Sequence, residues 1–231
     1  HTPEGEPISS NFVTAAPPPW RSHVDHALKC AGAAPSIDGS MWPWEHLALG
    51  YLILSVVWRL RGWCLDGRVV AVTVLATQLP DLVDKPLAWG VPLLPAGRSL
   101  AHSLLVAIPL FVSIGILARR HGRDGWGLAF ALGYASHLLG DVIPSLLVGD
   151  TGALTFLAWP LLPLPPFAGE AVVLARLEAI LAAPVVYLVA SPLRSAFLLL
   201  VVALWIGDGG PGLGPLRRRF SRGASLEVDG E

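Results

Sequence analysis

Residues Gln78–Ser103, QLPDLVDKPLAWGVPLLPAGRSLAHS, decide how the rest of the chain is interpreted. This stretch places two acids, Asp81 and Asp84, and two basic residues, Arg98 and His102, between long apolar segments. Apolar segments of this kind normally lie in lipid, where ionisable side chains cost free energy and therefore mark functional sites. We predict that these four residues belong to a functional site inside a membrane protein.

The composition of the whole chain agrees with a membrane protein. Hydrophobic residues make up 53% of the sequence and charged residues 14%, and the mean hydropathy is +0.59. Soluble domains carry about 25% charged residues. The formal net charge of -1 provides no basic stripe, so we expect no nucleic-acid partner. Cys30 and Cys64 fit no disulfide or metal-binding pattern, and we expect two unpaired thiols.

The apolar segments predict an all-α, polytopic membrane helix bundle of five or six transmembrane helices, with disordered N- and C-terminal tails. The predicted helices cover residues 42–60, 69–79, 98–117, 126–148, 171–190 and 193–206. The second is short against the roughly 20 residues that a spanning helix needs, so its neighbours, including Asp81 and Asp84, are drawn toward the membrane. Proline-rich residues 87–97 and 151–167 are expected to form loops or re-entrant pieces.

Three regions follow from this pattern. Residues 1–40 are expected to be a disordered extension, with Met41, the only methionine, as the natural start. Residues 41–206 are expected to form a membrane-embedded domain. Residues 207–231 are glycine-rich, then basic, then acidic, and are expected to form a flexible tail.

Alternating helix direction predicts that the ionisable groups meet on one side of the membrane. His46 opens the first helix, Asp81 and Asp84 end the second, Arg98 and His102 open the third, and His137 and Asp141 lie late in the fourth. Random placement would divide these residues between the two sides. The pairs Arg98/His102 and His137/Asp141 are spaced i,i+4, so on helices each pair shares a face.

Imidazole nitrogens together with carboxylate oxygens suit a divalent ion, with zinc preferred over manganese or iron. We predict as ligands His46, His102, His137, Asp141 and one of the two acids Asp81 and Asp84. We assign Asp81 to the metal and Asp84 to catalysis as general base. Arg98 is predicted to bind an anionic head group, and the alternative for it is an ion pair with Asp81 or Asp84.

Arginine counting gives an orientation. Arg59, Arg61 and Arg68 lie at or after the end of the first helix, and Arg119, Arg120 and Arg123 follow the third, all on the side opposite the site. The positive-inside rule then places the site on the non-cytoplasmic side of the plasma membrane. Six helices would put the arginine-rich tail on that side too. Either the last two segments do not both span, or the orientation is inverted.

The sequence resembles the YdjM-like family of LexA-regulated, membrane-bound predicted metal-dependent hydrolases. The matching pieces are WEHLALGYL with His46, LPDLVDKP with Asp81 and Asp84, GRSLAHSLL with Arg98 and His102, and GYASHLLGD with His137 and Asp141. The family pattern differs in having Pro-Asp-x-Asp where this chain has Asp-x-x-Asp, and a histidine where this chain has Gly97. The resemblance implies a metal-dependent hydrolase. A distant similarity of the family to zinc-dependent phospholipase C and P1-type nucleases implies phosphoester hydrolysis by analogy.

We therefore expect a metal-activated water to attack a small-molecule or lipid phosphoester, in a protein embedded in the lipid bilayer. The rival class is a metal- or proton-coupled transporter that uses the same groups as a relay. A third class is a non-catalytic membrane protein whose buried polar groups pair with each other. The sequence does not define the oligomeric state.

Overall fold

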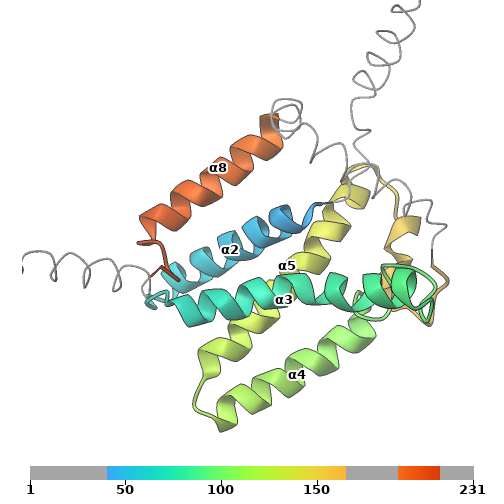
Figure 1. Cartoon of the computed structure of the whole chain (residues 1–231), viewed down its shortest axis with the longest axis horizontal. Coiled ribbons are helices and arrows are strands. Elements are labelled where there is room, and N and C mark those ends of the chain that lie inside the picture. The colour runs from blue at the N-terminus through green and yellow to red at the C-terminus, as the bar shows by residue number, and fades with distance from the viewer. Residues whose placement is uncertain (1–40, 165–191, 214–231) are drawn as a thin grey trace, which may run out of the picture. The chain divides into compact units, whose positions relative to one another are not determined.

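The computed structural model describes residues 41–164 and 192–213 (Figure 1). Every described helix belongs to one unit, Gly39–Glu231. The predicted disordered extension 1–40, the predicted helix 171–190 and the end of the predicted tail lie outside the described residues.

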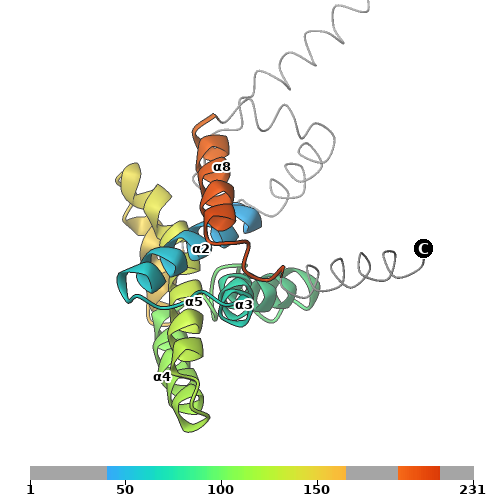
Figure 2. The same ribbon diagram turned by 90° about the vertical axis from the view of Figure 1, so that its left-hand side faces the viewer.

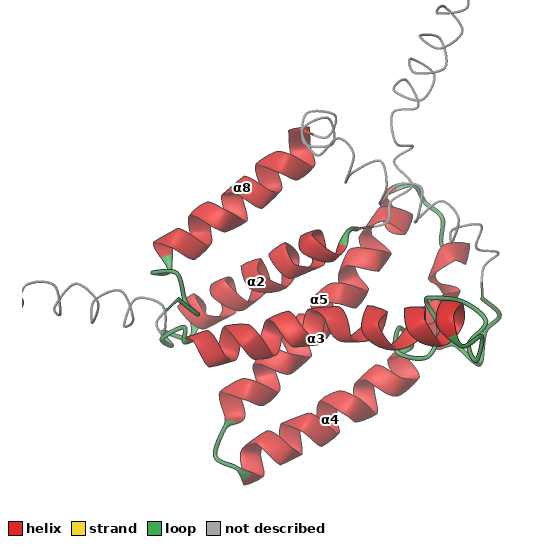
Figure 3. Ribbon diagram, viewed as in Figure 1, coloured by secondary structure: helices red, strands yellow, loops and turns green. Residues whose placement is uncertain are grey.

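All regular secondary structure among the described residues is helical, and no strand occurs among them (Figure 3). The prediction of an all-α fold is therefore confirmed for this part of the chain. The elements in chain order are α2 (Pro43–Leu60), α3 (Gly67–Lys85), the π-helical turn η1 (Pro86–Gly90), α4 (Leu104–Arg120), α5 (Asp124–Leu147), the 3₁₀ helix η2 (Gly152–Ala158) and α8 (Pro192–Gly207).

The second predicted helix is longer in the structure than its apolar run of residues 69–79. Asp66 caps α3, because its side chain accepts hydrogen bonds from the backbone N–H groups of Arg68 and Val69. The helix then continues through Pro80 to Lys85. Asp81 and Asp84 therefore lie in the last turns of α3.

The third predicted helix was placed too early in the chain. We expected it to begin at Arg98, but α4 begins at Leu104, where the Ser103 side chain accepts a hydrogen bond from Leu105 N and caps the helix. Arg98 and His102 therefore lie in the connection before α4. Their shared helical face, inferred from i,i+4 spacing, does not exist.

Helix α5 contacts α2, α3 and α4 and forms the centre of the described bundle. Its contact with α3 depends on Gly133, where an added Cβ would lie 2.6 Å from the backbone oxygen of Thr73. Gly50 of α2 similarly faces Thr77 and Ser136. Small residues at such crossings let helix backbones approach closely, as is common in membrane bundles. This close approach brings the polar residues of α2, α3 and α5 together.

Among the described helices, α5 is long and apolar enough to cross a membrane by length and composition. Large apolar side chains are also exposed along α4, including Leu105, Ile108, Val112 and Ile116. Such a continuous apolar face suits lipid better than water. Five or six spans remain a prediction.

Helix α8 contacts α2 and runs in the same general direction in Figure 1, and Figure 2 shows that the two helices cross at an angle. Arg194 near the start of α8 lies 3.6 Å from Glu45 near the start of α2. Asp208, directly after α8, forms an ion pair with Arg59 at the end of α2, with 2.5 Å between Arg59 Nη2 and Asp208 Oδ1. In a bundle of six spans with alternating directions, the last helix would run antiparallel to the first. The shared direction of α2 and α8 therefore favours an odd number of spans.

The residues directly after α8 make side-chain and backbone contacts with α2 and α8. Asp208 accepts hydrogen bonds from the hydroxyls of Tyr51 and Ser55, at 2.6 and 2.7 Å. The indole of Trp205 donates to the backbone oxygen of Pro211. These contacts hold the residues directly after α8 against α2 and α8, and the flexible tail over residues 207–231 stays a prediction.

Candidate metal centre

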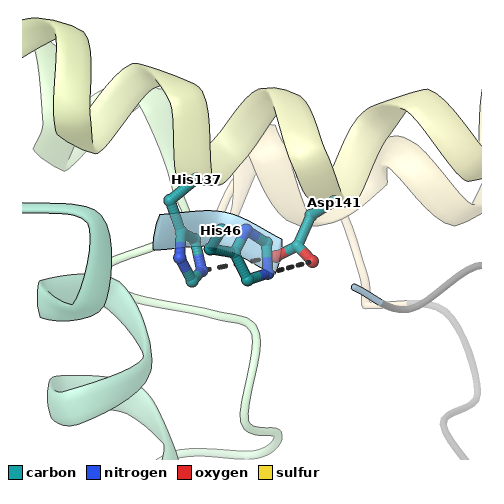
Figure 4. Close-up of side chains that lie close together, drawn as sticks. All are labelled: His46, His137 and Asp141. Carbon is teal, nitrogen blue, oxygen red and sulfur yellow. Dashed lines mark ion pairs between the residues drawn. The ribbon is translucent and has the colours of Figure 1, made fainter. Parts of the chain in front are cut away.

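The structure brings the five predicted ligands into one cluster, called here the His–Asp cluster. Its members come from the first turn of α2, the last turns of α3, the connection before α4 and the middle of α5: His46, Asp81, His102, His137 and Asp141. All are buried except Asp81, whose side chain is 13% exposed. Two overlapping triads share His137: His46–His137–Asp141 and Asp81–His102–His137. Figure 4 shows His46 and His137 turned toward the Asp141 carboxylate.

The imidazoles of His102 and His137 face each other through their Nε2 atoms, which are 3.1 Å apart. The Nδ1 atom of His102 lies 2.8 Å from Asp84 Oδ2, and that of His137 lies 2.6 Å from the backbone oxygen of Thr77. Both partners are acceptors, so each Nδ1 carries the proton and donates. Each Nε2 is thereby left to bind a cation, which is the arrangement found for metal-binding histidines.

The carboxylates of Asp81 and Asp141 each divide their two oxygens between the cluster and a basic side chain. Oδ1 of Asp81 lies 3.6 Å from His102 Nε2 and 3.7 Å from His137 Nε2, while Oδ2 pairs with Lys85 Nζ at 2.5 Å. Oδ2 of Asp141 lies 3.3 and 3.7 Å from the same two nitrogens. Its Oδ1 pairs with Arg98 Nη2 at 2.8 Å.

The distances fit a single small cation. The contacts that join the two Nε2 atoms to each other and to the two carboxylate oxygens span 3.1–3.7 Å. Tetrahedral zinc with bonds of about 2.0–2.2 Å separates its ligand atoms by about 3.3–3.6 Å. Oδ2 of Asp141 is also buried without a hydrogen-bond partner. The two imidazole nitrogens together with the oxygen of either acid could therefore hold one divalent ion.

His46 lies at the edge of this set. Its ring stacks on that of His137, with centroids 3.9 Å apart, and its Nε2 is 3.7 Å from Asp141 Oδ1. The ring fits there because residue 140 is glycine: an added Cβ would lie 2.9 Å from His46 Nδ1. His46 thus faces the Asp141 oxygen that also pairs with Arg98, and not the oxygen near His102.

Asp84 does not occupy the position expected of a general base. It is fully buried, and it accepts hydrogen bonds from the backbone N–H groups of Ser99, Ala101 and His102 as well as from the His102 ring. Both of its oxygens are occupied, and it lies behind His102 as seen from the cluster. The geometry therefore favours an orienting role for Asp84 over the predicted catalytic one.

The connection before α4 is held in place on several sides. Tyr134 of α5 donates a hydrogen bond from its hydroxyl to the backbone oxygen of Ala101. The Ser103 hydroxyl donates to the backbone oxygen of Trp159, which follows η2. Asp84 binds the same segment from α3. His102 is thus positioned by contacts from three directions, although it lies on no helix.

The charges around His102 favour a cation at its ring. Burial lowers the pKa of His102, but the nearby carboxylates of Asp141, Asp81 and Asp84 outweigh this effect and raise it to about 10. The acids therefore stabilise positive charge between the imidazoles, whether a proton or a metal ion supplies it.

Arg98 pairs with Asp141, and not with Asp81 or Asp84 as the alternative prediction proposed. Lys85 was not predicted as a site residue, although its i,i+4 spacing from Asp81 was a visible signal for the ion pair. Gly97, which replaces the histidine of the family pattern, faces Trp89: an added Cβ would lie 2.9 Å from the indole ring. A histidine at residue 97 would therefore collide with Trp89.

Comparison with known proteins supports the resemblance seen in the sequence. The YdjM inner membrane protein family matches residues 41–209, which include every member of the His–Asp cluster. Neither a curated protein nor a solved structure gives a significant match. Because the match covers most of the chain, the protein belongs to the YdjM inner membrane protein family.

Proposed function

We propose that this membrane protein is a metal-dependent hydrolase that acts on a phosphoester through one divalent ion, with zinc preferred. The observation that carries the proposal is the set of contacts of 3.1–3.7 Å around His102 Nε2 and His137 Nε2. His102, His137, Asp81 and Asp141 would hold the ion, and His46 would complete or support the set. The bound ion would supply an activated water and would polarise the phosphoryl group.

The remaining residues prepare this site. Asp84 fixes the ring of His102 so that Nε2 faces the cluster, and the backbone oxygen of Thr77 does the same for His137. Asp81 has the most exposed carboxylate of the cluster, so a molecule that approaches from solvent meets this acid first. Arg98 is partly exposed and holds Asp141 while keeping further N–H donors for an anionic group.

A hydrolase fits the described residues better than a transporter does. A relay would need polar groups that continue from the cluster toward the far end of the bundle. Between α2, α3 and α5, that end is instead filled by an apolar core of Leu54, Trp58, Val69 and Ala129. Within the described part of the chain, the ionisable residues of the cluster thus approach one end only.

The direction of α8 supports a site on the non-cytoplasmic side. Helix α8 ends beside Arg59, on the face where Arg61, Arg68, Arg119 and Arg120 also lie near helix ends. The sequence that follows α8 carries Arg217, Arg218, Arg219 and Arg222. If α8 spans, these basic groups share one face, which the positive-inside rule assigns to the cytoplasm. The conflict raised by six spans then disappears.

The hydrolase is tested with the protein purified in detergent and loaded with zinc or manganese, using bis(4-nitrophenyl) phosphate as a generic phosphodiester. We expect hydrolysis that chelation abolishes and metal restores. His137→Ala should lose it, whereas His121→Ala, which changes a histidine at the other end of α4, should retain it. Equal rates for His137→Ala and wild type, or rates unaffected by chelation, would remove the proposal.

A further inference from the structure

Two basic side chains flank the His–Asp cluster in equivalent ways. Lys85 pairs with the outer oxygen of Asp81, and Arg98 pairs with the outer oxygen of Asp141. Both side chains are more exposed than the cluster, at 32% for Lys85 and 28% for Arg98. A molecule that approaches the cluster from solvent therefore meets these two cations before it reaches the buried imidazoles.

The charge balance at this place favours an anion. The cluster and its neighbour Asp84 contribute three negative charges, and Lys85 and Arg98 contribute two positive ones. A divalent ion held by neutral imidazoles would bring the sum to one net positive charge. In a largely buried site, such an excess charge attracts a ligand of opposite sign.

Trp89 brings the two cation-bearing segments together. Lys85 Nζ lies 5.9 Å from the centre of the Trp89 ring, a cation–π contact. The same ring occupies the space that a side chain at residue 97 would take, directly before Arg98. The π-helical turn η1 thus carries an indole that touches both Lys85 and the backbone beside Arg98.

Both cations retain donors for a ligand. Lysine carries three N–H donors and arginine five. The ion pairs join Lys85 to one oxygen of Asp81 and Arg98 to one oxygen of Asp141. A phosphate group with several acceptor oxygens would use the remaining donors without breaking either pair.

We propose that Lys85 and Arg98 form an anion subsite beside the metal centre, and that Lys85 is a substrate-positioning residue that binds the phosphate group of a phosphoester. This inference rests on the proposed metal-dependent function, because the net positive charge requires the ion. The competing role for Lys85 is structural: it would hold Asp81 in place for the metal and never touch the substrate.

The test measures metal content and anion binding separately. Wild type, Lys85→Gln, Lys85→Arg and Arg98→Gln are loaded with zinc in detergent, freed of unbound metal and titrated with inorganic phosphate by calorimetry. Arg119→Gln is the matched control, because Arg119 is an exposed arginine paired with Asp124 where α4 ends and α5 begins. Zinc content is determined on the same samples by mass spectrometry.

We expect full zinc content in Lys85→Gln, with phosphate binding weakened roughly 10- to 100-fold, as for the loss of a charge-assisted hydrogen bond. Lys85→Arg should recover most of the affinity, and Arg119→Gln should bind as wild type does. Zinc loss in Lys85→Gln would overturn the proposal in favour of the structural role. Unchanged phosphate affinity with full zinc content would overturn it too, while leaving the metal centre intact. A wild type that binds no zinc would instead refute the proposed function itself.

Discussion

The Nε2 atoms of His102 and His137 lie 3.1 Å apart while the Nδ1 atom of each ring donates to an acceptor, Asp84 or Thr77. Two neutral imidazoles held in this way would direct lone pairs at each other, which is unfavourable in a buried place. A cation between them removes the repulsion. The contacts behind the rings therefore predispose this pair to bind a positive ion, and the nearby oxygens of Asp81 and Asp141 add to that preference.

Replacing Asp84 by asparagine should weaken metal binding without abolishing it. The amide cannot reproduce the carboxylate that accepts from three backbone N–H groups and the His102 ring. Loss of such an orienting partner typically costs about 10- to 100-fold in metal affinity. Competition with a chromophoric chelator measures the affinity, and Asp150→Asn serves as a control because Asp150 is exposed. An unchanged affinity would contradict the orienting role.

Gly133→Ala should destabilise the protein by about 1–3 kcal/mol, as expected for overpacking. The new Cβ would lie 2.6 Å from the backbone oxygen of Thr73, which cannot move without shifting α3. Gly115→Ala is the matched control, since nothing lies within 4 Å of a Cβ added there. That change should be neutral or stabilising by up to about 1 kcal/mol through helix propensity. Thermal unfolding in detergent compares the two variants, and equal stabilities would argue against the close α3–α5 contact.

The contact between α2 and α8 should weaken in acid. Burial raises the pKa of Asp208, but hydrogen bonds from Tyr51, Ser55 and Arg59 outweigh this and hold it below its ordinary value. The folded state therefore favours the ionised carboxylate. Its stabilisation is complete above the ordinary aspartate pKa of about 4 and is lost as the pH falls through the lowered value.

This pH effect is isolated by comparing the unfolding of wild type and Asp208→Asn between about pH 3 and about pH 7. The difference in stability between the two proteins should be largest at neutral pH and should shrink toward the acid end. Asp124→Asn, which alters an exposed ion pair, should show little difference at any pH. A gap between wild type and Asp208→Asn that is constant with pH would contradict the account.

The native Cys64 offers a test of membrane orientation. It is an exposed free thiol in the connection between α2 and α3, on the face with Arg61 and Arg68. In a Cys30→Ser background, a membrane-impermeant maleimide should label Cys64 in inside-out vesicles and not in right-side-out vesicles. Leu93→Cys, an exposed position after η1 introduced into a protein lacking Cys64, should give the opposite result. The reverse pattern would place the site in the cytoplasm.

The sequence allowed the cluster to be predicted because helix direction depends only on the order of apolar segments. Alternation alone places His46, Asp81 and His137 at the same end of the bundle, and the structure brings them together. The rule does not depend on where a helix begins. The error in the start of α4 therefore left the grouping of His102 with the others intact.

The roles of individual residues could not be predicted in the same way. Asp81 and Asp84 are three residues apart, yet one oxygen of Asp81 faces the imidazoles whereas Asp84 binds backbone N–H groups of the next connection. That difference is set by the path of residues 98–103, which form no regular helix and therefore have no periodicity to interpret. The partners of Arg98 and Lys85 and the fit of Trp89 against Gly97 likewise depend on this path.

The most direct test of the metal centre is the metal content of the purified protein, determined by mass spectrometry on wild type, His137→Ala and His121→Ala. His137 belongs to both triads, whereas His121 lies after the last turn of α4. We predict about one divalent ion per chain in wild type and His121→Ala, and almost none in His137→Ala. Equal metal content in wild type and His137→Ala, whether high or near zero, would contradict the account.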